Sequence, residues 1–270
     1  MPKIRVAVAG AAGRMGQRNL ALLAADPKSF SIAGALEHRS SPRLGEDAGT
    51  LIGKAQLGVR LTDDPAVALK SAQVMIDFTL PGASLALLPE LARRRVALVL
   101  GTTGFSADGL KKIKAASGKI PIVMSPNFSV GVNVMLKLLE QGARLLDEDY
   151  DIEVVEMHHN QKKDAPSGTA LKLAEVLCAA TGRNMAKDLV YARQGDTGVR
   201  TRREIGVQTL RGGDVVGDHT VFFAGMGERI EITHRATSRD NFATGAVRAA
   251  RWIVGKKTGL YSMHDVLGLR

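Results

Sequence analysis

Short apolar runs alternate with helix-like patterns along the first half of the chain. Strands are predicted over residues 4–9, 30–36, 74–78, 96–100 and 120–124, and a helix over 15–25. Apolar strands separated by helices are typical of a parallel sheet covered by helices on both faces. The first half is therefore predicted to be a doubly wound, Rossmann-like α/β domain.

The pattern changes after about residue 130. Helices are expected over 131–146 and from Ser167 to about residue 180, and strands over 151–157, 204–210, 219–224 and 229–235. Ile230, Ile232 and His234 alternate with Glu231 and Thr233, which is the two-residue period of a half-buried strand. The second region is therefore predicted to be a mixed α+β domain.

A final helix is expected over 241–254. We expect it to pack back on the first domain, because an α/β sheet needs helices over both faces. The predicted domains are thus 1–129 with 240–270, and 130–239.

A glycine-rich turn follows the first strand and opens the first helix. It consists of Gly10, Ala11, Ala12, Gly13, Arg14, Met15 and Gly16. Glycines here permit a tight turn and a close approach of the backbone to a pyrophosphate, which the N–H groups of the helix N-terminus attract. The spacing is G-x-x-G-x-x-G and not G-x-G-x-x-G, so an unrelated glycine-rich turn stays an alternative.

Glu37 closes the second strand, where an acid can bind the adenosine ribose of NAD. His38 and Arg39 come next, and either could meet the 2′-phosphate of NADP. NADH, NADPH or both are therefore candidate cofactors. Two further turns follow strands at the same edge of the sheet and are predicted to line the nicotinamide end. They contain Gly101, Thr102 and Thr103, and Ser125, Pro126, Asn127 and Phe128.

Charge and composition exclude little. The 37 Lys and Arg exceed the 27 Asp and Glu, so the net charge is +10, which suits anionic metabolites or nucleic acid. No aromatic residues interleave with the basic clusters, so we expect no nucleic-acid partner. One cysteine excludes an internal disulfide, and no apolar run reaches the roughly 18 residues of a membrane span. A cytoplasmic protein is expected.

The segment E-V-V-E-M-H-H-N-Q-K-K-D-A-P-S-G-T-A, residues 153–170, concentrates candidate chemistry. Ser167 is expected to cap a helix whose N–H groups, at Gly168 and Thr169, could bind a carboxylate. With His159, Lys162 and Lys163 they would form an anion site for a small dicarboxylate.

His158 or His159 could exchange a proton near neutral pH, and only one of the two adjacent side chains is expected to face the reacting centre. A structural histidine pair is the alternative. We expect no metal site, because no H-E-x-x-H motif or nearby cysteine accompanies them. Glu153 and Glu156 are expected on opposite strand faces, so they do not form a carboxylate pair.

The same segment resembles the signature of the 4-hydroxy-tetrahydrodipicolinate reductase (dihydrodipicolinate reductase) family. The motifs G-A-A-G-R-M-G, I-D-F-T, G-T-T-G-F, N-F-S-V-G-V-N and G-E-R-I-E-I-T-H extend the resemblance over essentially the whole chain. It implies an oxidoreductase of lysine and diaminopimelate biosynthesis that reduces 4-hydroxy-tetrahydrodipicolinate with NAD(P)H and loss of water. It also implies that the domain of residues 1–129 and 240–270 binds the dinucleotide, and that residues 130–239 bind the substrate and build a homotetramer.

The resemblance implies roles for individual residues. His158 would be the catalytic proton donor, with Lys162 as its partner and substrate ligand. Substrate carboxylates would bind His159, Ser167, Gly168 and Thr169. The turns named above, with Glu37, would line the NAD(P)H site. His38 stands where family members often carry an arginine, and Arg39 comes one residue later, so the choice between NADH and NADPH stays open.

Two other interpretations stay open. One is a different NAD(P)-dependent dehydrogenase that acts on an amino or keto acid. The other is a basic protein without catalytic activity that binds nucleic acid and uses the dinucleotide as a sensor; it would show steep salt dependence of binding.

Overall fold

The computed structural model describes residues 2–238 and 240–269. The chain divides into two compact units, Met1–Val130 with Asp240–Arg270, and Gly131–Arg239. The ends of the predicted domains at residues 1, 239 and 270 fall outside the described residues. No helix among the described residues is long and apolar enough to cross a bilayer.

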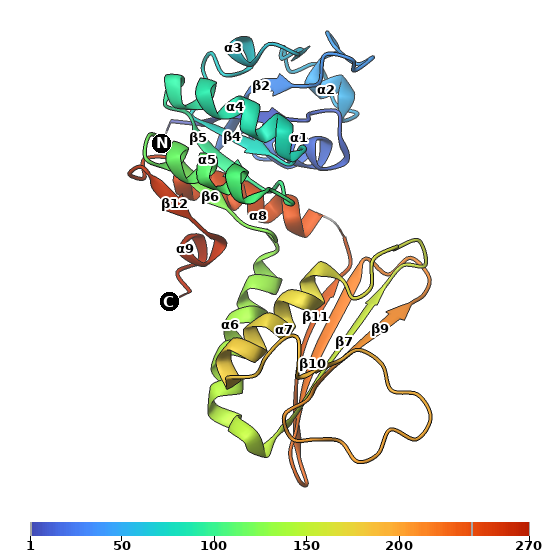
Figure 1. Cartoon of the computed structure of the whole chain (residues 1–270). Coiled ribbons are helices and arrows are strands. Elements are labelled where there is room, and N and C mark those ends of the chain that lie inside the picture. The colour runs from blue at the N-terminus through green and yellow to red at the C-terminus, as the bar shows by residue number, and fades with distance from the viewer. Residues whose placement is uncertain (1, 239, 270) are drawn as a thin grey trace. The chain divides into compact units, whose positions relative to one another are not determined.

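The first unit is built on a seven-stranded parallel sheet with the strand order β12-β6-β5-β4-β1-β2-β3 (Figure 1). The strands are β1 (Ile4–Ala9), β2 (Phe30–Leu36), β3 (Leu61–Thr62), β4 (Val74–Asp77), β5 (Ala97–Leu100), β6 (Pro121–Met124) and β12 (Gly259–Tyr261). Strand β1 pairs with β2 on one side and β4 on the other, which makes the carboxyl end of β1 the point where strand order reverses. The predicted doubly wound class is confirmed.

Helices cover both faces of this sheet. They are α1 (Arg14–Ala25), α2 (Ala48–Leu51), α3 (Pro65–Ala68), α4 (Pro81–Arg94), α5 (Ala107–Ser117), α8 (Asp240–Ile253) and α9 (Met263–Leu267). Helices α1, α8 and α9 pack on the face that carries Val6 and Val8 of β1. Helices α3, α4 and α5 pack on the face of Ala7 and Ala9. Successive residues of one strand therefore supply two separate cores, which explains the continuous apolar runs.

The C-terminal segment lies in the first unit. Helix α8 passes so close to the end of β6 that a Cβ on Gly245 would lie 1.7 Å from the carbonyl oxygen of Phe128. Strand β12 then pairs with β6 as an edge strand. Both β12 and β3 were missed in the sequence, because two or three residues are too short to show a period.

The second unit has a five-stranded sheet in the order β11-β10-β7-β9-β8. Strand β10 is antiparallel to β7 and β11, whereas β7, β9 and β8 are parallel, so the predicted mixed sheet is confirmed. The strands are β7 (Asp151–His158), β8 (Leu189–Val190), β9 (Ile205–Arg211), β10 (Gly217–Ala224) and β11 (Arg229–Ala236). One face of the sheet packs on α6 (Val130–Leu146) and α7 (Gly168–Thr181), as Figure 1 shows. A 3₁₀ turn, η1 (Asp147–Asp149), precedes β7.

The side chains of strand β7 alternate strictly between the helix-covered face of this sheet and the opposite face. Ile152 and Val154 point into the helix-covered core, and Glu156 and His158 continue the same row. Glu153 points to the other face, as predicted from the odd spacing. The core row of β7 therefore starts apolar and ends in two ionisable side chains at the carboxyl end of the strand.

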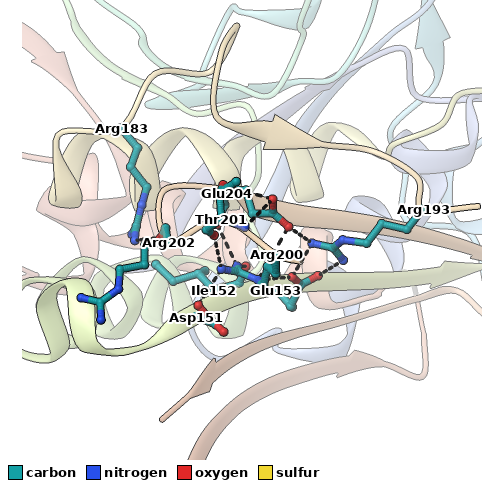
Figure 2. A network of polar contacts seen from close by, with 9 residues as sticks. All are labelled: Asp151, Ile152, Glu153, Arg183, Arg193, Arg200, Thr201, Arg202 and Glu204. Atoms are coloured by element: carbon teal, nitrogen blue, oxygen red, sulfur yellow. Dashed lines mark hydrogen bonds and ion pairs between the residues drawn. The ribbon is translucent and has the colours of Figure 1, made fainter. Parts of the chain in front are cut away.

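The segment 191–204 is fastened over the other face of β7 by two arginines (Figure 2). Arg193 donates to both carboxylate oxygens of Glu153, at 2.8 and 3.0 Å, and to Glu204 at 2.7 Å. Arg200 bonds Glu153 at 3.1 Å and Asp151 at 2.6 Å. Both carboxylate oxygens of Glu153 thus bind arginines that hold this segment against β7.

Candidate active site

The glycine-rich turn is packed tightly on itself. Gly10 has φ +62°, and a Cβ on Gly16 would lie 2.0 Å from the carbonyl oxygen of Gly10, so neither position accepts a side chain without distortion. Helix α1 starts after Gly13, and no side chain caps its N-terminus. Its first N–H groups are therefore oriented to donate hydrogen bonds to an anion.

Glu37 anchors this turn to the end of β2. One carboxylate oxygen accepts a hydrogen bond from Ala12 N at 2.7 Å, and the other accepts from His38 N at 2.9 Å. The His38 ring bonds Ser40 Oγ at 2.7 Å, while Arg39 is exposed. The structure therefore brings the predicted ribose-binding acid into contact with the predicted pyrophosphate turn.

The carboxyl ends of β4 and β5 meet beside this turn. A Cβ on Gly101 would lie 2.2 Å from the Phe78 ring, so the glycine is required by the aromatic side chain next to it. Thr102 is buried, and its hydroxyl accepts a hydrogen bond from Ser84 at 2.9 Å. Thr103 is exposed. Of the two predicted threonines, Thr103 is the one whose side chain a ligand can reach.

The last predicted turn has mixed roles. The Ser125 hydroxyl donates to the carbonyl of Asn127 at 2.8 Å, which closes the turn, and Pro126 is exposed. Phe128 is only 1% exposed and packs edge-on against Phe78, with 5.4 Å between ring centroids. Its side chain supports the turn from within the core of the unit.

The residues of the first unit fit a dinucleotide. A cradle closed to side chains, an uncapped helix N-terminus and an acid at the end of the neighbouring strand β2 all lie at the strand-order reversal. Dinucleotides bind at this point of doubly wound sheets.

In the second unit, the buried carboxylate of Glu156 collects donors from three elements. Arg211 of β9 bonds both oxygens, at 3.0 and 3.1 Å. Ser167 N bonds one oxygen at 3.0 Å, Thr209 Oγ1 bonds the same oxygen at 3.2 Å, and His158 Nδ1 bonds the other at 2.5 Å. Burial opposes ionisation, but these hydrogen bonds outweigh it and hold the pKa of Glu156 below its ordinary value.

His158 lies at the mouth of this network, with 11% of its side chain exposed. Burial lowers the pKa of His158 below its ordinary value. The hydrogen bond and charge of Glu156 oppose that shift, and the positive charges of Lys162 and Arg211 add to it. A dianionic ligand would counter those positive charges, so its binding should raise the pKa of His158.

The N-terminus of α7 lies next to the Glu156 carboxylate. Ser167 caps the helix as predicted, because its hydroxyl accepts from Ala170 N at 3.1 Å. Ser167 is also 2% exposed, and its hydroxyl lies 3.1 Å from His219 Nε2. Both polar groups of Ser167 therefore have protein partners, which leaves Gly168, at the exposed start of α7, to face a ligand.

The basic loop places its cations unequally. Lys162 is largely buried and bonds both oxygens of Asp164 at 2.9 Å. His159 is half-buried, and its backbone N–H donates to the carbonyl of Val215 at 2.7 Å. Lys163 is exposed. Lys162 is thus the lysine held next to His158, and an incoming carboxylate would compete with Asp164 for it.

The chain matches known proteins over nearly its full length. The N-terminal model of the dihydrodipicolinate reductase family matches residues 4–128, and the C-terminal model matches residues 131–267. The chain is 56% identical over 266 residues to a 4-hydroxy-tetrahydrodipicolinate reductase from Anaeromyxobacter dehalogenans, covering 98% of each chain. It is 51% identical to one from Syntrophotalea carbinolica, covering 99% of this chain and 100% of that one. The chain belongs to the dihydrodipicolinate reductase family.

A solved structure of this family has the same fold. It is a dipicolinate-bound dihydrodipicolinate reductase from Paenisporosarcina sp. TG-14, with a TM-score of 0.79 and 23% identity, covering 98% of this chain and 99% of that one. The resemblance drawn from the sequence is confirmed, and with it the expectation of a reductase.

Three residues that surround His158 in this reductase-family chain were not predicted from the sequence as members of the site. For Glu156 the sequence predicts only that it does not pair with Glu153, although its two-residue spacing from His158 places both on one strand face. Arg211 follows the predicted strand 204–210, and the structure extends β9 to include it. His219 opened another predicted strand without any sign of a partner. Its ring lies 5.2 Å from the His158 ring, and burial lowers its pKa to about 4.

Proposed function

We propose that this chain reduces 4-hydroxy-tetrahydrodipicolinate to tetrahydrodipicolinate, with loss of water, in lysine and diaminopimelate biosynthesis. The observation that carries the proposal is the histidine His158. It is bonded to the ionised carboxylate of Glu156, which also accepts from Ser167 N at the start of α7, and Lys162 and Arg211 are nearby. This arrangement pairs a proton donor with an anion site, and it lies on the segment that carries the family signature.

The chemistry needs one hydride and one proton. Loss of the 4-hydroxyl and a neighbouring ring hydrogen as water leaves a conjugated imine. The glycine-rich turn and Glu37 would hold a nicotinamide nucleotide, which would supply the hydride for C4. The electron-rich ring system that results takes up one proton. His158 donates that proton from Nε2, because its Nδ1 is engaged by Glu156.

The cations and the α7 N-terminus hold the substrate. Its carboxylates bind at Gly168, Thr169, His159 and Lys162, where N–H groups and a lysine favour anions. The same negative charges raise the pKa of His158, so the proton and the substrate bind together. The descending limb of kcat should therefore lie at higher pH than that of kcat/KM, since the latter reports the free enzyme.

The test is the loss of absorbance at 340 nm, with substrate generated from pyruvate and aspartate semialdehyde by the preceding synthase. His158→Gln should lower kcat by about 10²–10⁴-fold, the usual contribution of a general acid. Glu153→Gln, on the other strand face, should retain turnover. No NAD(P)H oxidation by folded wild-type protein would contradict the reaction, and activity on amino or keto acids instead would favour a different dehydrogenase.

Both NADH and NADPH serve as cofactors in this proposal. Glu37 lies where an acid binds the adenosine ribose of NADH, and the exposed Arg39 can meet a 2′-phosphate. Parallel assays with the two nucleotides test this, and strict use of one of them would contradict it.

A homotetramer formed by the second unit is also part of this proposal. The face of the five-stranded sheet away from α6 and α7 carries apolar side chains, among them Phe222 and the 50% exposed Leu210. Light scattering during size-exclusion chromatography tests the mass, and a monomer would contradict the proposal. A cytoplasmic location stays a prediction, and cell fractionation would check it.

A further inference from the structure

The carboxylate of Glu156 has more contacts than a packing role requires. It lies in the row of β7 that otherwise carries Ile152 and Val154, and it is fully buried. A buried charge is retained only when paired and hydrogen-bonded, and Glu156 has a bidentate arginine, a backbone N–H, a hydroxyl and an imidazole. Two oxygens thus join β7, β9 and the start of α7.

The two oxygens divide these donors unequally. Oε1 accepts from Ser167 N, Thr209 Oγ1 and one nitrogen of Arg211. Oε2 accepts from the other nitrogen of Arg211 and from His158 Nδ1 at 2.5 Å. The three donors at Oε1 consequently fix the plane of the carboxylate. Oε2 therefore faces the imidazole in one orientation.

An ionised carboxylate can only accept hydrogen bonds. His158 must therefore carry hydrogen on Nδ1 in its neutral and its charged form, and Nε2 is left as the nitrogen that gains and loses the proton. The ring is also confined on the Nε2 side, where a Cβ on Gly217 of β10 would approach to 2.9 Å.

We infer that Glu156 is a positioning residue for proton transfer, which fixes the tautomer and the orientation of His158 and is itself held by Arg211 and Ser167. The inference rests on the proposed function for its effect on turnover, but the fixed tautomer is a property of the chain without any ligand.

The charged and titratable groups that face His158 come from four places. Glu156 lies on its own strand, Lys162 on the following loop, Arg211 on β9 and His219 on β10. Glu156 is the one negative charge among these four, so a change at this residue should dominate any change in the titration of His158.

Glu156→Gln is the sharpest perturbation, because shape is kept while charge is lost. Three donors meet at Oε1, so the amide oxygen is expected on that side, which turns the NH₂ group toward Nδ1 of His158. An NH₂ group donates to that nitrogen. The neutral tautomer should then reverse to Nε2–H, and the protonated form should become less accessible.

Two measurements test the inference. The first is the ¹⁵N chemical shifts of the His158 ring in ligand-free protein, which distinguish an Nδ1–H from an Nε2–H tautomer. The wild type should show Nδ1–H and Glu156→Gln should show Nε2–H. The second is the pH profile of turnover. Its descending limb should move to lower pH and kcat should fall by about 10- to 10⁴-fold, the range for a histidine whose orienting carboxylate is removed, while KM changes little.

Glu153→Gln is the matched control, because it makes the same substitution three residues away at a carboxylate that is likewise paired with arginine, here Arg193 and Arg200. It should leave the tautomer and the pH profile unchanged. If Glu156→Gln does not fold, Glu156→Asp keeps the charge beside Arg211 but draws the carboxylate back by one methylene, and it should also lose the fixed tautomer and reduce kcat.

The outcomes separate the two proposals. An Nε2–H tautomer in the wild type, or an unchanged tautomer and pH profile in the variants, would overturn the role of Glu156. An Nδ1–H tautomer in a wild-type protein that oxidises no NAD(P)H would support the role of Glu156 and contradict the proposed reaction.

Discussion

Gly217→Ala should reduce turnover by displacing a single ring. A Cβ at this position would lie 2.9 Å from Nε2 of His158 and 3.3 Å from Cδ2, whereas ordinary van der Waals contact begins at 3.4 Å. The imidazole must therefore move by about 0.5 Å, and its bond to Glu156 resists that movement. A misplacement of about 1 Å can cost about 10²-fold in rate, so half that displacement should lower kcat by about 10-fold.

The assay is NAD(P)H oxidation at 340 nm, together with the melting temperature. The fold should tolerate the change, because Gly217 does not have a positive φ and its Cβ would meet side-chain atoms of His158 and not backbone. Gly142→Ala is the control in the same unit: its Cβ would meet Phe223 at 3.9 Å, an ordinary contact, so kcat should stay unchanged. Wild-type kcat for Gly217→Ala, or an equal loss in Gly142→Ala, would refute the reasoning.

Three further predictions follow from other parts of the chain. Arg39→Ala should raise KM for NADPH by about tenfold or more, the effect of losing a hydrogen bond to a charged group, and should leave KM for NADH unchanged; equal changes for both nucleotides would contradict a phosphate contact. His219 has a pKa of about 4 in the folded state, below its ordinary 6.5. The unfolded chain binds more protons between these values, so stability should fall as pH drops from 6.5 to 4, by up to about 3 kcal/mol. Urea unfolding of the wild type should show this slope and His219→Gln should lose it; equal slopes would contradict the assignment. Cys178 is buried, and burial raises the pKa of its thiol, so a thiol reagent should label it only after unfolding, and rapid labelling of native protein would count against this burial.

Local pattern determined the types of element and the faces of their residues. Apolar runs and two-residue alternation located β1, β2 and β7 to within a residue of their observed bounds. The same period places Glu156 and His158 on one strand face, because side-chain direction in a strand depends only on parity along the chain. The glycine-rich turn and the cap at Ser167 could also be predicted from the sequence, since both depend on neighbouring residues.

Only the tertiary structure decided which groups surround His158. Glu156 meets Arg211 across 55 residues of sequence, and Ser167 meets His219 across 52. These contacts follow from the order β10-β7-β9 and from a register that sets His158 beside Arg211. A period along one strand says which face a side chain takes, but not which strand lies next to it or at what register. Strand pairing therefore decides the charge, the tautomer and the confinement of His158, the candidate proton donor. The sequence pattern alone predicts only that this histidine lies at a strand end.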